Sequence, residues 1–490
     1  RVPPSQLHPP LGKSHFIAHH GVKHPRKPAI RVVFDTASKY DGRSLCTETY
    51  SGPDRLKNLN GVLLRFRENP VPVIGDLRQF YHSVCLPANC IDYFRFFWFS
   101  DPNDPTSRIV EYRLTRHLFG GKWSQSVCAH ALDCAITDAV KSGDITPEEA
   151  EHTRLSLYSD DYTRSFISSQ VAEDSMLNLI RFLKKSGFHL AKLATPDQRL
   201  FNAFPKETRA IQDDDNLGPP ATATVLGVGW HLSSDSLCFD LTDFDGKIST
   251  KRQLLSKVAG VFDPIGLITF ATTPGKLLVQ TCFREGLGWD DRLPDHIQRS
   301  VNEWIERLRS LGEITFPRRI TTLPNAKPTL GLHTFSDASQ FIIAVIAYVR
   351  SIAPDGSIDV QPVLAKTRLA PMKGLTIPRL ELAACVLAAR VSCLLQKELN
   401  VTFESITHWS DSSAALGYIR NTTTRFSVFV GNRVEEIQAT TSINSWRHVP
   451  TKLNPADGLT RGHCPTKPSV ILKTPPYSAT SCPMITRFSF

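Results

Sequence analysis

The chain of 490 residues is 41% hydrophobic and 21% charged, a composition that excludes disordered and fibrous proteins and suggests about three globular units. Its 57 basic and 47 acidic residues give a formal charge of +10, which favours a polyanionic partner but also occurs in basic enzymes without one. No apolar run approaches the roughly 20 residues of a membrane span. The eleven cysteines show no CxxC pair or zinc-knuckle spacing. We therefore expect no membrane contact, structural zinc or disulfides, but reduced thiols in an intracellular protein.

The first part of the chain predicts short strands and helices around a buried strand that ends in an acidic residue. Residues 1–30 are rich in Pro, His and Lys and predict an extended basic flap. Residues 71–76 predict a buried strand that ends at Asp76, and the apolar spacing after it predicts a helical turn. The other expected elements are strands at 29–34, 91–99 and 109–114, the last two paired, and helices at 127–140 and 174–185.

Residues 155–163 alternate as a β-hairpin does, with Asp160 and Asp161 side by side at its tip. Such a pair is by itself more typical of a solvated turn, because Asp tolerates the left-handed conformation and caps its own backbone. Two adjacent carboxylates are also suitable ligands for a hard divalent cation. The hairpin alone leaves both interpretations open.

The middle of the chain predicts a helical connector. The polar, acidic residues 212–220 form the first candidate linker. A strand is expected at 223–230, and helices at 251–261, 275–284 and 294–311. Their basic positions either follow a polyanion or form a solvated surface, and the sequence favours neither interpretation.

The last third, from about residue 324, predicts a sheet with helices. The expected strands are 329–337, 341–348, 360–366, 405–411 and 444–450, and the expected helices are 377–399, 412–419 and 426–437. Residues after 462 are rich in Pro, Ser and Thr, have no periodicity and predict a loose tail.

Four acidic residues occupy the places where ligands gather in such a sheet. Asp337 and Asp411 end two strands, Glu381 lies in the first turn of the long helix, and Asp457 follows the last strand. Each one alone is more typical of a helix cap. Four carboxylates that meet at one edge, however, repel one another unless cations are present. Such a cluster suits two hard divalent ions about 4 Å apart, as in-line phosphoryl displacement requires.

The order of these motifs resembles the Pol region of Pao/BEL-type LTR retrotransposons, in unbroken order over residues 14–462. The segments similar to their ribonuclease H domain are 335–339, 378–382, 409–415 and 454–457. Those that resemble fingers and palm motifs of their reverse transcriptase are 30–38, 75–76 and 158–161. Residues 251–256, 261–267 and 287–289 look like its thumb and connection.

The resemblance implies a polymerase site in which Asp76, Asp160 and Asp161 hold two Mg²⁺ or Mn²⁺ ions. One ion would activate the primer 3′-hydroxyl and the other would grip the incoming triphosphate. Tyr81 matches the aromatic residue that excludes a 2′-hydroxyl, with a plain core tyrosine as the alternative. Arg31 matches the fingers arginine that contacts the triphosphate, with a surface strand arginine as the alternative.

A second implied site has Asp337, Glu381, Asp411 and Asp457 as ligands of two further ions that cut the RNA strand of a hybrid. His448 lies nine residues before Asp457, where a mobile histidine assists product release in related enzymes.

The expected fold class is a multidomain α/β and α+β protein. Fingers and palm of a right-hand polymerase are expected at 1–211, a helical thumb and connection at 212–323, a ribonuclease H-like mixed sheet with helices at 324–462, and the tail at 463–490. The chain begins without Met and shows no leader, and we expect a piece of a Pol polyprotein that elsewhere carries a protease and an integrase.

Two segments depart from the family pattern. Ser159 stands where the usual Tyr-Val-Asp-Asp turn has valine, and residues 120–126 replace a small-residue, Pro-containing turn. The tail from His463 does not resemble the family.

The sequence therefore predicts an RNA-directed DNA polymerase with ribonuclease H activity. Its partners would be an RNA template, a DNA primer, the RNA–DNA hybrid and deoxynucleoside triphosphates, in a cytoplasmic particle or the nucleus. The basic surplus would hold phosphates and make the affinity salt-dependent. The alternatives are a catalytically silent, nucleic-acid-binding remnant of the same fold and an unrelated metal-dependent phosphatase or nuclease.

Overall fold

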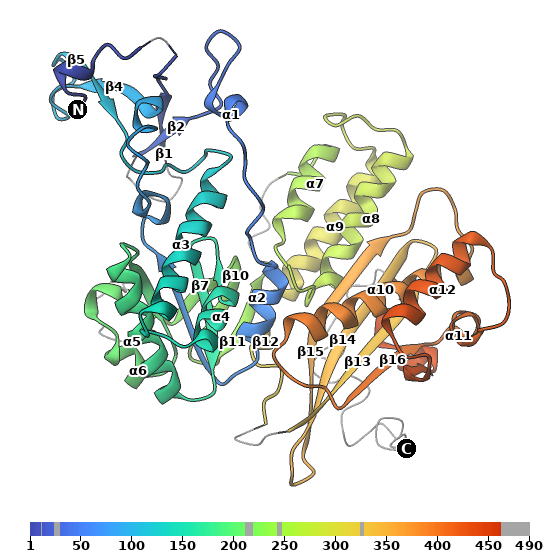
Figure 1. The fold of residues 1–490 in the computed structure, drawn as a ribbon. Coiled ribbons are helices and arrows are strands. Elements are labelled where there is room, and N and C mark those ends of the chain that lie inside the picture. The colour runs from blue at the N-terminus through green and yellow to red at the C-terminus, as the bar shows by residue number, and fades with distance from the viewer. Residues whose placement is uncertain (11, 24–29, 211–218, 243–246, 324–327, 462–490) are drawn as a thin grey trace.

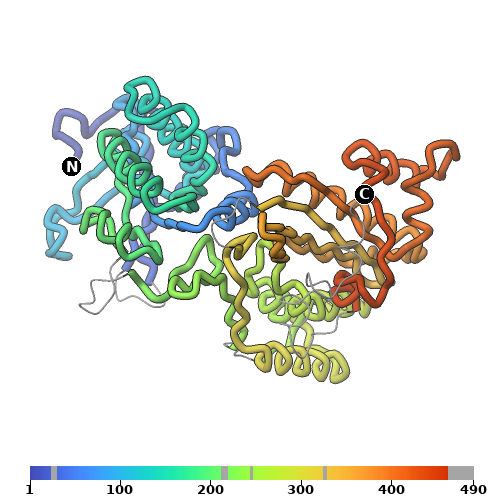
Figure 2. Tube along the Cα trace, turned by 90° about the horizontal axis from the view of Figure 1, so that it is seen from below, coloured from blue at the N-terminus to red at the C-terminus, as the bar shows by residue number. Residues whose placement is uncertain are grey.

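The computed structural model describes residues 1–10, 12–23, 30–210, 219–242, 247–323 and 328–461. In Figure 1 the first part of the chain lies on the left and a large sheet with its helices on the right. Between them lie three helices, α7 (Lys251–Gly260), α8 (Thr269–Arg284) and α9 (Asp295–Leu311). Figure 2 shows the same parts from below. The linker expected at 212–220 lies largely outside the described residues, and the tail expected at 463–490 lies wholly outside them.

The N-terminal segment carries two small antiparallel sheets. Strand β1 (Ala18–Lys23) pairs with β2 (Ile30–Asp35), and β4 (Arg95–Phe99) pairs with β5 (Ile109–Arg113). The expected pairing of the two aromatic segments is confirmed. The expected flap is corrected in one respect, because its residues 18–23 form a strand whose backbone groups pair with β2.

A four-stranded sheet in the order β6-β7-β3-β8 follows. Its strands are β6 (Leu157–Tyr158), β7 (Asp161–Phe166), β3 (Val71–Leu77) and β8 (Leu190–Ala194). Side chains of α3 (Ser124–Lys141) and α5 (Ser169–Lys185) share one apolar core with this sheet. The shorter helices of this part are α1 (Leu45–Glu48), α2 (Leu59–Phe66), α4 (Pro147–Leu155) and α6 (Gln198–Ala203).

The middle of the chain contains a second four-stranded sheet beside the three expected helices, in the order β12-β11-β10-β9. The single strand expected at 223–230 is wrong, because the structure has β9 (Thr222–Val225) and β10 (Val228–His231) there. Leu226 and Gly227 adopt φ values of 47° and 87°, the left-handed pair that a two-residue hairpin turn requires. Strands β11 (Ser236–Asp240) and β12 (Glu313–Pro317) complete the sheet.

The last part is the predicted mixed sheet, with five strands in the order β15-β14-β13-β16-β17. Strand β13 runs antiparallel to β14 and parallel to β16. The centre of β14 is buried on both faces: Ile346 packs in a core with α8, and Val345 packs in a core with α10 (Ile377–Glu398). Burial on both faces explains its near-continuous apolar sequence. The remaining elements are β13 (Thr329–Ala338), β14 (Ile342–Ile352), β15 (Ile358–Leu369), β16 (Ser405–Ser410), β17 (Trp446–His448), α11 (Ser413–Arg420), α12 (Val428–Thr440) and α13 (Pro455–Thr460).

One apolar core runs through the three parts. Phe66 of α2, Trp230 of β10 and Phe335 of β13 belong to the same buried cluster, so the elements that carry the acidic residues are held on one continuous scaffold. Within the described ranges, every helix is too short or too polar to cross a membrane.

Candidate active sites

The first acidic group lies where the β6–β7 hairpin meets β3. Asp76 and Asp161 are direct partners in the antiparallel pairing of β3 with β7, so their side chains share one face of the sheet. Asp160 lies in the turn, and its carbonyl oxygen accepts a hydrogen bond from the amide of Leu77 (2.7 Å). The hairpin prediction is confirmed, and the three predicted residues lie at one end of the sheet.

These carboxylates disfavour one another's charge. Burial, followed by the charges of Asp160 and Asp76, raises the pKa of Asp161 to about 6. Lys192 of β8 partly relieves this repulsion, because its Nζ lies 2.5 Å from Oδ2 of Asp76. The sequence analysis missed Lys192, since an isolated lysine in a short strand carries no signal of a distant carboxylate partner.

A cavity of about 820 Å³ opens beside this group. Its lining includes Arg31, Asp76, Tyr81 and Asp160, four of the five residues predicted for the polymerase site, together with further basic side chains such as Arg78. A cavity lined by both carboxylates and guanidinium groups suits a metal-bound polyphosphate.

The two departures from the family pattern contact each other here. The hydroxyl of Ser159 donates to Oε1 of Gln125 (3.0 Å), and the hydroxyl of Tyr81 donates to the same atom (2.7 Å). Gln125 belongs to residues 120–126, the segment that departs from the usual turn. Gln125 thus contacts both the hairpin tip and Tyr81. The ring of Tyr81 is only partly buried.

The second acidic group lies at the edge of the mixed sheet. Ligand atoms of Asp337, Glu381 and Asp411 all lie within 4.8 Å of one another. They come from β13, from α10 and from the residue after β16. Parallel pairing of β13 with β16 brings the two strand ends together. Glu381 is the fifth residue of α10, which begins at Ile377, one residue beyond the first turn that the sequence predicted.

Burial and mutual repulsion disfavour the charged forms of these carboxylates. Desolvation raises the pKa of Glu381 to about 8 and that of Asp337 to about 6, and in both cases the neighbouring carboxylates add to the shift. Oε2 of Glu381 is buried and has no hydrogen-bond partner. An unsatisfied buried carboxylate oxygen that faces two other carboxylates is the arrangement a divalent cation satisfies.

Neighbouring side chains hold the second group in place. Thr460 of α13 donates to Oδ2 of Asp337, and Asn454 Nδ2 donates to the carbonyl oxygen of Ser336 (3.0 Å). Sequence reasoning missed Thr460 and Asn454 as supporting residues. Asp457 of α13 lies near enough to raise the pKa of Asp337, and it pairs with Arg461 (2.7 Å).

His448 ends β17 and is exposed. It pairs in register with Ser410, the residue before Asp411. The structure therefore brings His448 to the same edge of the sheet but not into the buried group.

The donor chemistry of the second group fits a hard divalent cation, since all three close ligands are carboxylates and one oxygen lacks a partner. Within the part of the chain that the structure describes, Asp76, Asp160 and Asp161 do not form a group with all ligand atoms within 4.8 Å. Their all-oxygen set still suits the same kind of ion, which would compete with Lys192 for Asp76.

Two buried arginines tie the parts that carry the sites together. Arg67, just after α2, donates to the carbonyl oxygens of Arg318 (2.7 Å), Val363 (3.0 Å) and Pro362 (2.8 Å). Arg318, just after β12, pairs with Asp235 (2.6 Å). Both arginine side chains are fully buried. The two guanidinium groups therefore link the chain around the end of α2 to the middle sheet and to the mixed sheet.

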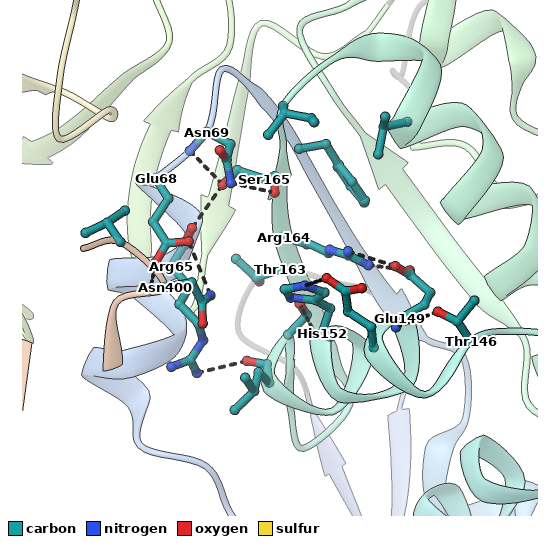
Figure 3. A pocket seen from close by; sticks show the side chains of 17 residues that line it. Arg65, Glu68, Asn69, Thr146, Glu149, His152, Thr163, Arg164, Ser165 and Asn400 are labelled. Carbon is teal, nitrogen blue, oxygen red and sulfur yellow. Dashed lines mark hydrogen bonds and ion pairs between the residues drawn. The ribbon is translucent and has the colours of Figure 1, made fainter. Parts of the chain in front are cut away.

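A cavity of about 450 Å³, shown in Figure 3, is lined by Arg65 and Glu68, which flank Arg67 in the chain, and by further residues. On one wall the carboxylate of Glu68 accepts a hydrogen bond from the backbone amide of Asn400 (2.6 Å). On the other wall Arg164 forms a two-pronged ion pair with Glu149. Burial raises the pKa of Glu68 from 4.5 to about 7.

The fold is similar to that of solved retroviral reverse transcriptase structures. Residues 250–412 match the family model described as the Pao retrotransposon-like RNaseH-like domain, which confirms the resemblance to Pao elements over this segment. The match runs from α7 to Asp411 and includes three of the four predicted nuclease carboxylates.

Two solved structures are similar in fold. The foamy viral protease-reverse transcriptase dRH in complex with double-stranded DNA has a TM-score of 0.54 and 12% identity, with 89% of this chain and 65% of that chain covered. The foamy viral protease-reverse transcriptase in complex with an RNA/DNA hybrid has a TM-score of 0.51 and 14% identity, with 89% and 51% covered. This chain thus spans about half to two thirds of those chains. No curated protein sequence matches it.

Proposed function

We propose that the chain is an RNA-directed DNA polymerase and ribonuclease H of a Pao/BEL-type retroelement. The observation that carries the proposal is the pair of separate carboxylate groups, one at the β6–β7 hairpin and one at the edge of the mixed sheet, on a single reverse transcriptase fold. The foamy viral relatives hold double-stranded DNA or an RNA/DNA hybrid, which supports nucleic acids of these kinds as partners.

In the proposed polymerase site, Asp76, Asp160 and Asp161 are the ligands. Two Mg²⁺ or Mn²⁺ ions bound at each acidic group would activate the attacking oxygen and neutralise charge on the phosphoryl group. Arg31 binds phosphate oxygens of the incoming deoxynucleoside triphosphate through its guanidinium group. Tyr81, fixed by its bond to Gln125, places its ring where a 2′-hydroxyl would clash.

In the proposed nuclease site, Asp337, Glu381, Asp411 and Asp457 are the ligands, and Thr460 orients Asp337. His448, exposed at the same sheet edge, is positioned to assist release of the cut strand. Burial of Glu381 and Asp337 shields both carboxylates from water, which strengthens their attraction for a cation.

In the proposed arrangement, residues 1–211 form the fingers and palm, residues 212–323 the thumb and connection, and residues 324–462 the nuclease. The RNA template and the DNA primer would pass from the first site to the second as a hybrid. Protease and integrase parts would lie elsewhere in the full polyprotein, which would act in a cytoplasmic particle or the nucleus.

The test is Mg²⁺-dependent extension of a DNA primer on an RNA template, with cleavage of the RNA in a preformed hybrid measured in parallel. We expect both activities, and EDTA should abolish both. Salt-dependent hybrid binding without either activity would instead identify a silent remnant, and hydrolysis of simple phosphate esters without hybrid binding would identify an unrelated hydrolase.

A further inference from the structure

Three side chains with different metal-binding chemistry meet on the middle sheet, far from both acidic groups in the sequence. His231 lies on β10, Cys238 on β11 and Glu313 on β12, and these strands are neighbours with β11 between the other two. One ligand atom from each lies within 4.8 Å of the other two. Nε2 of His231 is 2.9 Å from Oε1 of Glu313. The imidazole and the carboxylate therefore meet across the strand that carries the thiol.

The three side chains lie on the face of the sheet that turns away from its core. Trp230, Leu237 and Ile314, the chain neighbours of the three residues, are buried in the core, and side chains alternate between faces along a strand. His231 and Cys238 are partly buried and Glu313 is exposed. The backbone of the sheet therefore holds these three residues in place, while their side chains are open to an ion from solvent.

The backbone beneath the thiol leaves space for it. Gly229 pairs with Cys238 across β10 and β11, and a Cβ atom on Gly229 would come within 2.5 Å of the Cys238 sulfur. Any other residue at position 229 would displace the sulfur, so glycine keeps it near the imidazole and the carboxylate.

The electrostatic surroundings also favour a cation. The carboxylates of Glu313 and Asp240 lie near Cys238, and their negative charge attracts a cation. A bound metal ion takes the thiolate form of cysteine, and the thiol proton leaves to solvent. One nitrogen, one sulfur and one oxygen donor form a borderline-soft set that suits Zn²⁺ or Co²⁺ and not Mg²⁺.

We propose that His231, Cys238 and Glu313 form a binding site for a transition-metal ion of the Zn²⁺ class, with the fourth coordination position open to water or an incoming ligand. Tetrahedral coordination needs donor atoms roughly 3.5 Å apart, so only small side-chain movements separate the observed arrangement from a bound one. The ion would bridge β10, β11 and β12. Sequence spacing gave no sign of this site, because its residues come from three strands and lie up to 82 positions apart.

The test uses the full chain, freed of metal by chelation and titrated with Co²⁺ alone. We expect a near-ultraviolet thiolate-to-cobalt charge-transfer band that reaches a plateau as Co²⁺ is added. Co²⁺ held by the carboxylates of Asp337, Glu381 and Asp411 should not contribute to this band, because all three ligands are oxygen donors. Excess Zn²⁺ should remove the band, and Mg²⁺ should not.

Variants identify the ligands. Cys238→Ser should abolish the band, and His231→Gln should weaken Co²⁺ binding by about tenfold or more. Cys393→Ser is the matched control, since Cys393 is also a partly buried free thiol, and it should leave the band unchanged. Both His231→Gln and the control alter partly exposed positions, so the fold should survive. The proposal would be overturned if the natural chain shows no band. It would also be overturned if the band persists in Cys238→Ser or is unaffected in His231→Gln.

Discussion

The hydroxyl of Ser159 donates a hydrogen bond to the side-chain oxygen of Gln125, 3.0 Å away. Ser159 stands where the Tyr-Val-Asp-Asp turn that this segment resembles has valine, and Gln125 lies in residues 120–126, the other segment that departs from the resemblance. The two departures are thus partners in one contact, together with Tyr81. A paired change of this kind is compatible with a working hairpin.

Valine at position 159, as in the Tyr-Val-Asp-Asp turn that this hairpin resembles, should destabilise this protein. Ser159 has a φ of 57°, a left-handed conformation that β-branched side chains disfavour. We expect Ser159→Val to lower the free energy of unfolding by about 1 to 3 kcal/mol, measured by denaturant titration. Ser159→Gly loses the hydroxyl without the strain and should cost less. Equal stability of Ser159→Val and the natural chain would contradict this account.

Removing the Lys192 ammonium should make the palm site easier to load with metal. Lys192 pairs with Asp76 at 2.5 Å and so competes with a cation for that carboxylate. We expect Lys192→Gln to lower the Mg²⁺ concentration for half-maximal primer extension by roughly twofold to fivefold, a modest effect because the lysine is exposed. Lys185→Gln, which breaks the surface pair with Asp144, is the control. A higher Mg²⁺ requirement in Lys192→Gln would refute the competition.

The buried arginine joint should contribute heavily to stability. Arg67→Leu leaves three buried carbonyl oxygens without their donor, and we expect a loss of about 3 to 5 kcal/mol in denaturant titration. Arg67→Lys keeps the charge but not the planar fork and should recover only part of the loss. The exposed Arg299 gives a control, because Arg299→Leu should cost little. A loss below about 1 kcal/mol for Arg67→Leu would show that the joint is dispensable.

Glu68 should make stability depend on pH. Burial raises its folded-state pKa to about 7, above the ordinary 4.5, so the folded protein holds this proton more tightly than the unfolded chain does. Its contribution is therefore complete below pH 4.5 and is lost as the pH rises through 7. We expect the unfolding free energy of Glu68→Gln to decline less over this window, by about 1 to 2 kcal/mol.

The control for Glu68 is Glu148→Gln. Glu148 lines the same cavity but has a mostly exposed side chain, so its replacement should leave the pH profile unchanged. Parallel profiles for the natural chain and Glu68→Gln would mean that Glu68 titrates normally.

The sequence was enough to predict the features that depend on the local pattern of residues and on the order of the motifs. The apolar run at 341–348 was enough for β14, and the positions of Asp337 and Asp411 at strand ends were enough to expect a shared sheet edge. The hairpin at Leu226 and Gly227 was missed because leucine rarely adopts the left-handed conformation and the surrounding apolar residues imitate one strand. Contacts between distant segments were beyond any local pattern, as Arg67 with Arg318 and Thr460 with Asp337 illustrate.

The central claim is that one chain carries two independent phosphoryl-transfer sites, and paired substitutions test it most directly. Primer extension on RNA and cleavage of a preformed hybrid are measured for Asp161→Asn and Asp411→Asn, with circular dichroism as the check on folding. We expect Asp161→Asn to lose extension by about a hundredfold or more and keep cleavage, and Asp411→Asn to do the reverse. Folded variants that each lose both activities, or that lose neither, would contradict the account.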